Sequence, residues 1–128
     1  MLLDMSTTKV VGFIQVADTA RARTFYEGVL GLTLRDDGFA LVADFPGCML
    51  RITTLPAWKA TEAPAFGFIV PNAKGFAAGL TAAGVALERY PFLGDAQGPD
   101  GVWTGPDGVQ VAWFKDPDGN LLSVTTPP

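Results

Sequence analysis

The stretch VVGFIQVADTARARTFYEGVLGL, residues 10–32, predicts a strand that passes directly into a helix. Its first seven residues are rich in β-branched and aromatic side chains, which is typical of a strand. Asp18 follows, and its carboxylate is suited to cap the free N–H groups at the start of a helix. Apolar residues then recur at helical spacing as far as Tyr26 and Val29. We therefore expect a helix over residues 19–30 that buries both of these side chains.

The same order of elements occurs twice along the chain. After the first helix, hydrophobic runs separated by turn residues predict three strands, at residues 32–35, 39–44 and 48–54. A strand at 65–70 and a helix at 73–83, capped by Asn72, open the second copy, and Phe76 and Leu80 are its expected buried side chains. Further strands are predicted at 85–90, 102–104, 109–114 and 120–125, with a loop over 91–101.

This repetition predicts an α+β protein made of two βαβββ modules. The first module spans residues 9–55 and the second 65–126, joined by a linker over 56–64 that contains two prolines. The tripeptide Gly-Phe-Ile at 12–14 recurs at 67–69 and supports an internal duplication. We expect a single domain, because its 128 residues are close to the size of one ordinary domain.

Composition excludes several classes of function. The chain carries 9 basic and 13 acidic residues, a net charge of −4, which argues against binding nucleic acid or an anionic membrane. It has no histidine, so the commonest metal ligand and the commonest general base are missing. Its one cysteine, Cys48, has no histidine to activate it, and we interpret it as a buried structural thiol.

Nothing in the sequence predicts export or membrane insertion. The first residues, MLLDMSTTKV, lack a basic segment, and Asp4 interrupts their apolar start. The apolar runs are shorter than the roughly 18 residues that a spanning helix needs. We expect a cytoplasmic protein.

Local motifs indicate tight turns and allow two interpretations of each candidate binding residue. Three Pro-Asp-Gly triplets, at 99–101, 106–108 and 117–119, have the residues of tight turns and lack the spacing of a calcium loop. Arg51 lies in the middle of a predicted strand, where it either faces solvent or anchors an anionic group. Trp103 and Trp113 either pack in the core or offer a stacking surface to a flat ligand. A third tryptophan, Trp58, lies in the linker.

At this point the sequence resembles the vicinal oxygen chelate superfamily, which includes glyoxalase I, extradiol dioxygenases and bleomycin-resistance proteins. The resemblance lies in the first helix, from Val16-Ala17-Asp18 through the Phe25-Tyr26 pair to Leu32, and in the segment FKDPDGNLL at 114–122. It implies two βαβββ modules whose curved mixed sheets enclose a ligand cleft, with the helices outside. Such a fold hosts several chemistries, so it does not fix the reaction.

The resemblance also implies which positions would hold a metal. Members that bind a metal take one ligand from the first and last strand of each module, and these positions fall on Val11, Arg51, Ala65 and Ser123. Two of these side chains are apolar, one is a neutral hydroxyl and one is a cation. We therefore expect no metal and no other cofactor.

The same positions imply a ligand-binding cleft. Its expected binding residues are Phe13, Gln15, Met49, Arg51, Trp103, Trp113 and Ser123, with Val11 and Thr125 beside them. The expected function is metal-free binding of a small aromatic or anionic molecule, as in bleomycin-resistance-type members, in a homodimer. The alternative is a metal-dependent lyase or dioxygenase. A metal-free enzyme is a third reading, with acid–base candidates Tyr26, Glu27, Glu88 and Tyr90.

Overall fold

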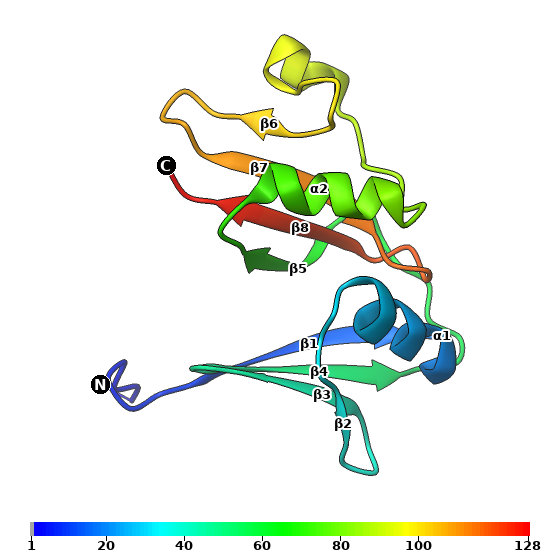
Figure 1. The fold of residues 1–128 in the computed structure, drawn as a ribbon. Helices are drawn as coiled ribbons and strands as arrows, with labels where there is room; N and C mark the ends of the chain where they lie inside the picture. The colour runs from blue at the N-terminus through cyan, green and yellow to red at the C-terminus, as the bar shows by residue number, and fades with distance from the viewer. Residues whose placement is uncertain (1) are drawn as a thin grey trace. The chain divides into compact units, whose positions relative to one another are not determined.

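The computed structural model describes residues 2–128, and the chain divides into two compact units (Figure 1). The first unit ends at Lys59 and the second spans Ala60–Pro128. This boundary lies inside the linker predicted over 56–64. Each unit is a βαβββ module, as expected, and each is described by itself below.

The first unit contains one sheet, sheet A, and one helical segment. Its strands are β1 (Val10–Val16), β2 (Arg35–Asp36), β3 (Leu41–Phe45) and β4 (Cys48–Thr54). They are ordered β1-β4-β3-β2, with β1 parallel to β4 and the other pairs antiparallel. The predicted bounds of β1 and β4 are confirmed. The predicted strand at 32–35 is wrong, because only Arg35 and Asp36 pair with β3.

The helical segment of the first unit changes its geometry halfway along. It begins as α1 (Thr19–Arg23), capped by the Asp18 carboxylate, which accepts from the N–H of Arg21 at 3.0 Å. It continues as a π-helical segment, η1 (Thr24–Val29). A π-helical turn holds more residues than an α-helical turn, so positions beyond it are rotated relative to the expected stripe. Tyr26 is fully buried, whereas Val29 is 37% exposed, and its predicted burial is wrong.

The second unit repeats the plan in sheet B. Its strands are β5 (Pro64–Ile69), β6 (Trp103–Thr104), β7 (Gln110–Lys115) and β8 (Leu121–Thr126), ordered β5-β8-β7-β6. Helix α2 (Ala73–Ala82) is capped by Asn72, whose side chain accepts from the N–H of Gly75. Its Leu80 is buried and its Phe76 is half-buried against Phe114.

The connection between α2 and β6 differs from the prediction. The segment at 85–90 is not a strand, since only Leu87 forms an isolated bridge with Phe114. The expected loop contains a short 3-10 segment, η2 (Pro91–Ala96), which is kinked at Gly94. This segment places Phe92 and Leu93 beside Trp103 and Trp113 of sheet B.

The repeated Gly-Phe-Ile tripeptide is not structurally equivalent in the two units. Ile14 is 1% exposed, whereas Ile69 is 79% exposed. Phe13 pairs with Arg51 of β4, but in the second unit it is Gly67 that pairs with Ser123 of β8. A shift of one residue moves a side chain to the other face of a strand. The two units repeat one strand order, but this sequence match lies one residue out of phase with that repeat.

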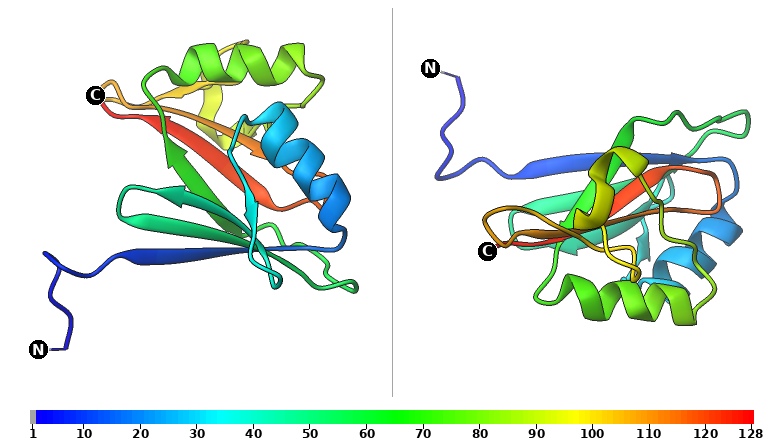
Figure 2. Two further views of the ribbon diagram at one scale, coloured as in Figure 1. Left: turned by 60° about the horizontal axis from the view of Figure 1, so that its bottom comes forward. Right: turned by 90° about the horizontal axis from the view of Figure 1, so that it is seen from above.

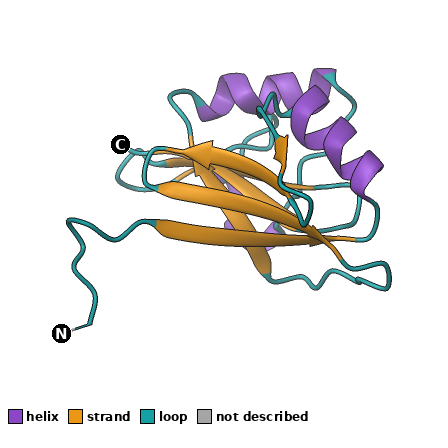
Figure 3. Cartoon of the chain, turned by 90° about the horizontal axis from the view of Figure 1, so that it is seen from below, coloured by secondary structure: helices purple, strands orange, loops and turns teal. Residues whose placement is uncertain are grey.

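Each sheet has one buried face and one open face. In sheet A the buried face carries Leu50 and Ile52 of β4, which are 0% and 1% exposed. In sheet B it carries Phe114 and Val124, both fully buried, and α2 packs on β7 and β8 (Figure 2). Figure 3 distinguishes the helical segments from the strands. Within residues 2–128, every helix is too short or too polar to span a membrane.

Candidate functional site

The open face of sheet A carries side chains from alternate positions of β1 and β4. Phe13 pairs with Arg51 and Gln15 pairs with Thr53, so these four side chains share that face. Phe13 is 54% exposed, and the Thr53 hydroxyl donates to Gln15 Oε1 at 2.7 Å. Met49 lies on the same face, next to Arg51. The four residues predicted from the first module therefore lie together.

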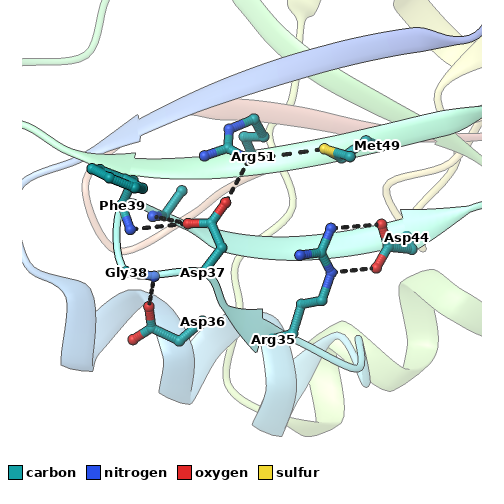
Figure 4. A network of polar contacts seen from close by, with 9 residues as sticks. Arg35, Asp36, Asp37, Gly38, Phe39, Asp44, Met49 and Arg51 are labelled. Atoms are coloured by element: carbon teal, nitrogen blue, oxygen red, sulfur yellow. Dashed lines mark hydrogen bonds and ion pairs between the residues drawn. The ribbon is translucent and has the colours of Figure 1, made fainter.

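Arg51 is held by a carboxylate of its own unit (Figure 4). Its Nη1 donates to Asp37 Oδ2 at 2.8 Å, and both side chains are 23% exposed. Asp37 lies in the turn between β2 and β3, where its Oδ1 also accepts from the N–H groups of Phe39 and Ala40, each at 2.9 Å. The Phe39 N–H, followed by Arg51, lowers the pKa of Asp37 to about 2. The carboxylate is thus ionised at neutral pH and compensates the charge of Arg51.

A second ion pair lies on the same sheet. Arg35 donates from Nε and Nη2 to the two carboxylate oxygens of Asp44, at 2.7 and 3.2 Å (Figure 4). Val42 pairs with both Arg35 and Arg51 and is fully buried. Long arginine stems can cover an apolar neighbour while their charged ends stay wet. The two arginines thus flank an apolar position in the middle of the sheet.

The open face of sheet B holds an aromatic cavity of about 300 Å³. Trp103 of β6 and Trp113 of β7 form one wall, with ring centroids 6.4 Å apart. Tyr90 lies edge-on to Trp113 at 5.3 Å, and Phe92 of η2 lies 5.8 Å from Tyr90. The remaining lining residues are Glu62, Pro64, Leu93 and Leu121.

Charged groups surround Tyr90 and Trp113. Lys115 Nζ lies 3.3 Å from Glu62 Oε1 and 3.6 Å from Glu88 Oε1. These carboxylates, Glu62 first, raise the pKa of Lys115. The pKa of Tyr90 is also raised, first by burial and then by Glu88, with Lys115 opposing. Two carboxylates therefore hold one ammonium beside the aromatic rings.

A buried glutamine fixes the segment that carries Tyr90. Gln97 is 5% exposed, and its Nε2 donates to the carbonyl oxygens of Glu88 and Gly101 at 2.8 and 3.0 Å. Its Oε1 accepts from the N–H of Tyr90 at 2.9 Å. Because this segment has almost no strand pairing, Gln97 takes the place of a neighbouring strand.

Ser123 lies on the open face of sheet B but does not line the cavity. A Cβ on Gly67 would come within 2.7 Å of the Ser123 hydroxyl, so a larger residue there would require that hydroxyl to move. The predicted binding residues thus form two groups. Phe13, Gln15, Met49 and Arg51 lie on sheet A, and Trp103, Trp113 and Ser123 lie on sheet B.

Sequence reasoning missed Asp37, Phe92 and Gln97 as parts of these sites, and considered Tyr90 only as an acid–base group. Asp37 had a signal in the Asp-Asp-Gly turn, whose position relative to Arg51 needs the strand register. Of the acid–base candidates, Tyr26 is fully buried and Glu27 is paired with Arg23 at 3.0 Å. Glu88 and Tyr90 are the two that lie near the cavity.

The positions expected to hold a metal do not fit one. Val11 and Arg51 lie on the open face of sheet A, and Ala65 lies where the pairing of β5 with β8 is irregular. Divalent metals are bound by imidazole, thiolate, carboxylate or carbonyl ligands. The hydroxyl of Ser123 is the one neutral oxygen among these four side chains. Within residues 2–128, no three His, Cys, Asp or Glu side chains are grouped to bind a metal ion.

A larger hollow of about 400 Å³ lies around the turn between β3 and β4. Phe45 is the single aromatic ring in its lining, and the lining carboxylate, Asp44, is already paired with Arg35. The aromatic cavity therefore offers more to a small flat ligand.

The βαβββ repeat with an open face on each sheet defines a glyoxalase-type fold. The model of the glyoxalase/bleomycin resistance protein/dioxygenase superfamily matches residues 7–124, and the chain belongs to this superfamily. Comparison with curated proteins gives no match.

Solved structures show the same fold at low sequence identity. An integron cassette protein from V. cholerae is 24% identical over the whole of both chains, with a TM-score of 0.67. The lactoylglutathione lyase of Agrobacterium tumefaciens is 15% identical, over 94% of this chain and 93% of its own, with a TM-score of 0.69. A virulence protein from Salmonella typhimurium is 18% identical over both whole chains, with a TM-score of 0.66. These likenesses establish the fold alone.

Proposed function

We propose that this protein binds a small molecule with a flat aromatic part, without a metal ion. The observation that carries the proposal is the cavity in which Trp103, Trp113 and Tyr90 meet. Aromatic contacts of this kind contribute about 0.5–1.5 kcal/mol each beyond the burial of area. The volume of about 300 Å³ matches the lower end of ordinary ligand pockets.

The position of Arg51 favours a second candidate ligand, an anion bound on the open face of sheet A. It lies on the face away from Leu50 and Ile52, beside the exposed ring of Phe13. An anion there would compete with Asp37 for the guanidinium, because Asp37 already occupies Nη1. This competition makes the anion the weaker candidate.

The alternative function is a metal-dependent lyase or dioxygenase of the same superfamily. The side chains of Val11, Arg51, Ala65 and Ser123 speak against it, because they offer no set of metal ligands. Elemental analysis of the dialysed protein tests this directly. About one transition metal per chain would overturn the metal-free proposal.

Tryptophan fluorescence tests binding at the cavity. Titration with naphthalene- and quinoline-type probes should quench the emission, and Trp113→Leu should weaken binding by about tenfold. Trp58→Phe is the matched control, because Trp58 lies outside the cavity lining. Equal affinities for the wild type and Trp113→Leu would contradict the proposal.

We also propose a homodimer. Apolar side chains on β1 and at the end of β3 are exposed, namely Val10, Val11, Phe13 and Phe45. Light scattering should give twice the chain mass of 13.5 kDa. A monomer at micromolar concentration would contradict this.

A further inference from the structure

The aromatic cavity combines ring faces with an excess of negative charge. Its four rings follow one another in the order Phe92, Tyr90, Trp113 and Trp103, with neighbouring centroids 5.8, 5.3 and 6.4 Å apart. We propose that this cavity selects a small organic cation, a quaternary ammonium or an N-alkylated aromatic ring, over neutral or anionic molecules of the same shape. This inference rests on the proposed function, since it names the ligand class of the same cavity.

The ring geometry suits a cation. A positive charge within about 6 Å of a ring centroid is attracted to the electron-rich face of the ring, and tryptophan attracts it most strongly. Successive centroids here are 5.3–6.4 Å apart, so the rings contact one another, and a charge seated in the cavity against one ring lies close to its neighbour as well. A neutral ligand would gain the stacking contacts and lack this attraction.

The surrounding charges favour the same sign. Glu62 and Glu88 carry two negative charges, and Lys115, which lies within 3.3–3.6 Å of both, carries one positive charge. The group therefore keeps one net negative charge. Arg89 keeps its positive charge but lies outside the lining of this cavity, and its guanidinium donates to the carbonyl oxygens of Gln97 and Gly98.

Burial and the same carboxylates raise the pKa of Tyr90. After burial, the largest influence on its pKa is Glu88, which raises it, and Lys115 only partly opposes this effect. Glu62 also raises it. An anionic ligand would meet the same carboxylates, and the ammonium that could attract it is already shared between them.

Three bicyclic probes of similar shape test the charge preference by calorimetry at slightly alkaline pH. N-methylquinolinium is cationic, quinoline is neutral under these conditions and 1-naphthoate is anionic. We expect N-methylquinolinium to bind about tenfold more tightly than quinoline, and 1-naphthoate to bind most weakly.

Charge variants of the same pocket sharpen the test. Glu62→Gln combined with Glu88→Gln should reduce the ratio of the affinity for N-methylquinolinium to the affinity for quinoline by about fivefold. Lys115→Gln should change the preference in the opposite direction, which a loss of folding cannot imitate. Asp107→Asn is the matched control, because it removes one charge from an exposed turn outside the cavity lining.

The outcomes separate the two proposals. Equal binding of quinoline and N-methylquinolinium would overturn the inference about charge and leave the aromatic ligand in place. Tightest binding of 1-naphthoate would overturn it in favour of an anion. Failure of all three probes to bind would overturn the proposed function, and the inference with it.

Discussion

The two modules share one strand order but carry different side chains on their open faces. Sheet A is ordered β1-β4-β3-β2 and sheet B is ordered β5-β8-β7-β6, with the first and last strands of each module parallel. On the open face of sheet A, Arg51 and Asp37 form an ion pair. On the open face of sheet B, Trp103 and Trp113 line a cavity.

This difference shows which positions the fold constrains. The buried faces carry similar side chains, such as Leu50 and Ile52 in one module and Leu122 and Val124 in the other, because each must build a core. The open faces have no such requirement, and equivalent positions hold Arg51 in β4 and Ser123 in β8. The open faces can therefore differ between the modules, and the binding residues that we propose lie on them.

The largest expected effect tests the one-residue offset between the two Gly-Phe-Ile tripeptides. Ile14→Ala should lower the free energy of unfolding by about 3–4 kcal/mol, because Ile14 is buried in the core. Ile69→Ala should cost less than about 0.5 kcal/mol, because Ile69 is 79% exposed. Urea denaturation of both variants measures the difference. Similar losses would show that a partner chain or another surface covers Ile69 in solution.

The next largest effect is expected for Gln97, the buried glutamine of the second module that bonds three backbone groups. Gln97→Ala should cost about 2–4 kcal/mol, since it leaves buried partners of three hydrogen bonds unsatisfied. It should also weaken ligand binding at the cavity, because Tyr90 loses its backbone anchor. Gln110→Ala, at a half-buried strand position, is the control in denaturation and titration experiments. If Gln97→Ala leaves the free energy of unfolding unchanged, the segment is held by its apolar contacts and not by these hydrogen bonds.

Some elements of the two modules could be predicted from the sequence and others could not. Strands β1 and β4 were predicted with correct bounds because residues that favour strands are bounded by Asp18 in the first case and by Pro46-Gly47 and Pro56 in the second. The π-helical segment and the connection after α2 were not predicted, because their geometry depends on tertiary packing rather than on local pattern. The aromatic cavity was foreseen only as a pair of tryptophans, since Tyr90 and Phe92 reach it through an irregular segment.

Lowering the pH should destabilise the first module through protonation of Asp37. Its pKa in the folded protein is about 2, below the ordinary value of 3.8, so the carboxylate stabilises the fold above pH 3.8. This contribution should be lost as the pH falls from about 4 to about 2. Carbon NMR of the carboxyl group gives the pKa, and Asp37→Asn should remove this part of the pH dependence. An ordinary pKa for Asp37 would contradict the hairpin geometry around Phe39 and Ala40.

The smallest effect on stability is expected for Arg51→Met. Methionine keeps an unbranched apolar stem, and the ion pair that it removes is partly exposed, so unfolding by urea should change little. Asp37 keeps the N–H groups of Phe39 and Ala40, and its pKa should rise only part of the way to the ordinary value.

The same residue separates the two modules in binding. Arg51→Met should abolish any binding of 1-naphthoate on sheet A, whereas Asp37→Asn should strengthen it by about fivefold, because it releases the guanidinium from its carboxylate. Neither change should alter binding of N-methylquinolinium, since neither residue lines the aromatic cavity. If Arg51→Met weakens binding of the cation as well, the contrast between the modules fails at the level of function.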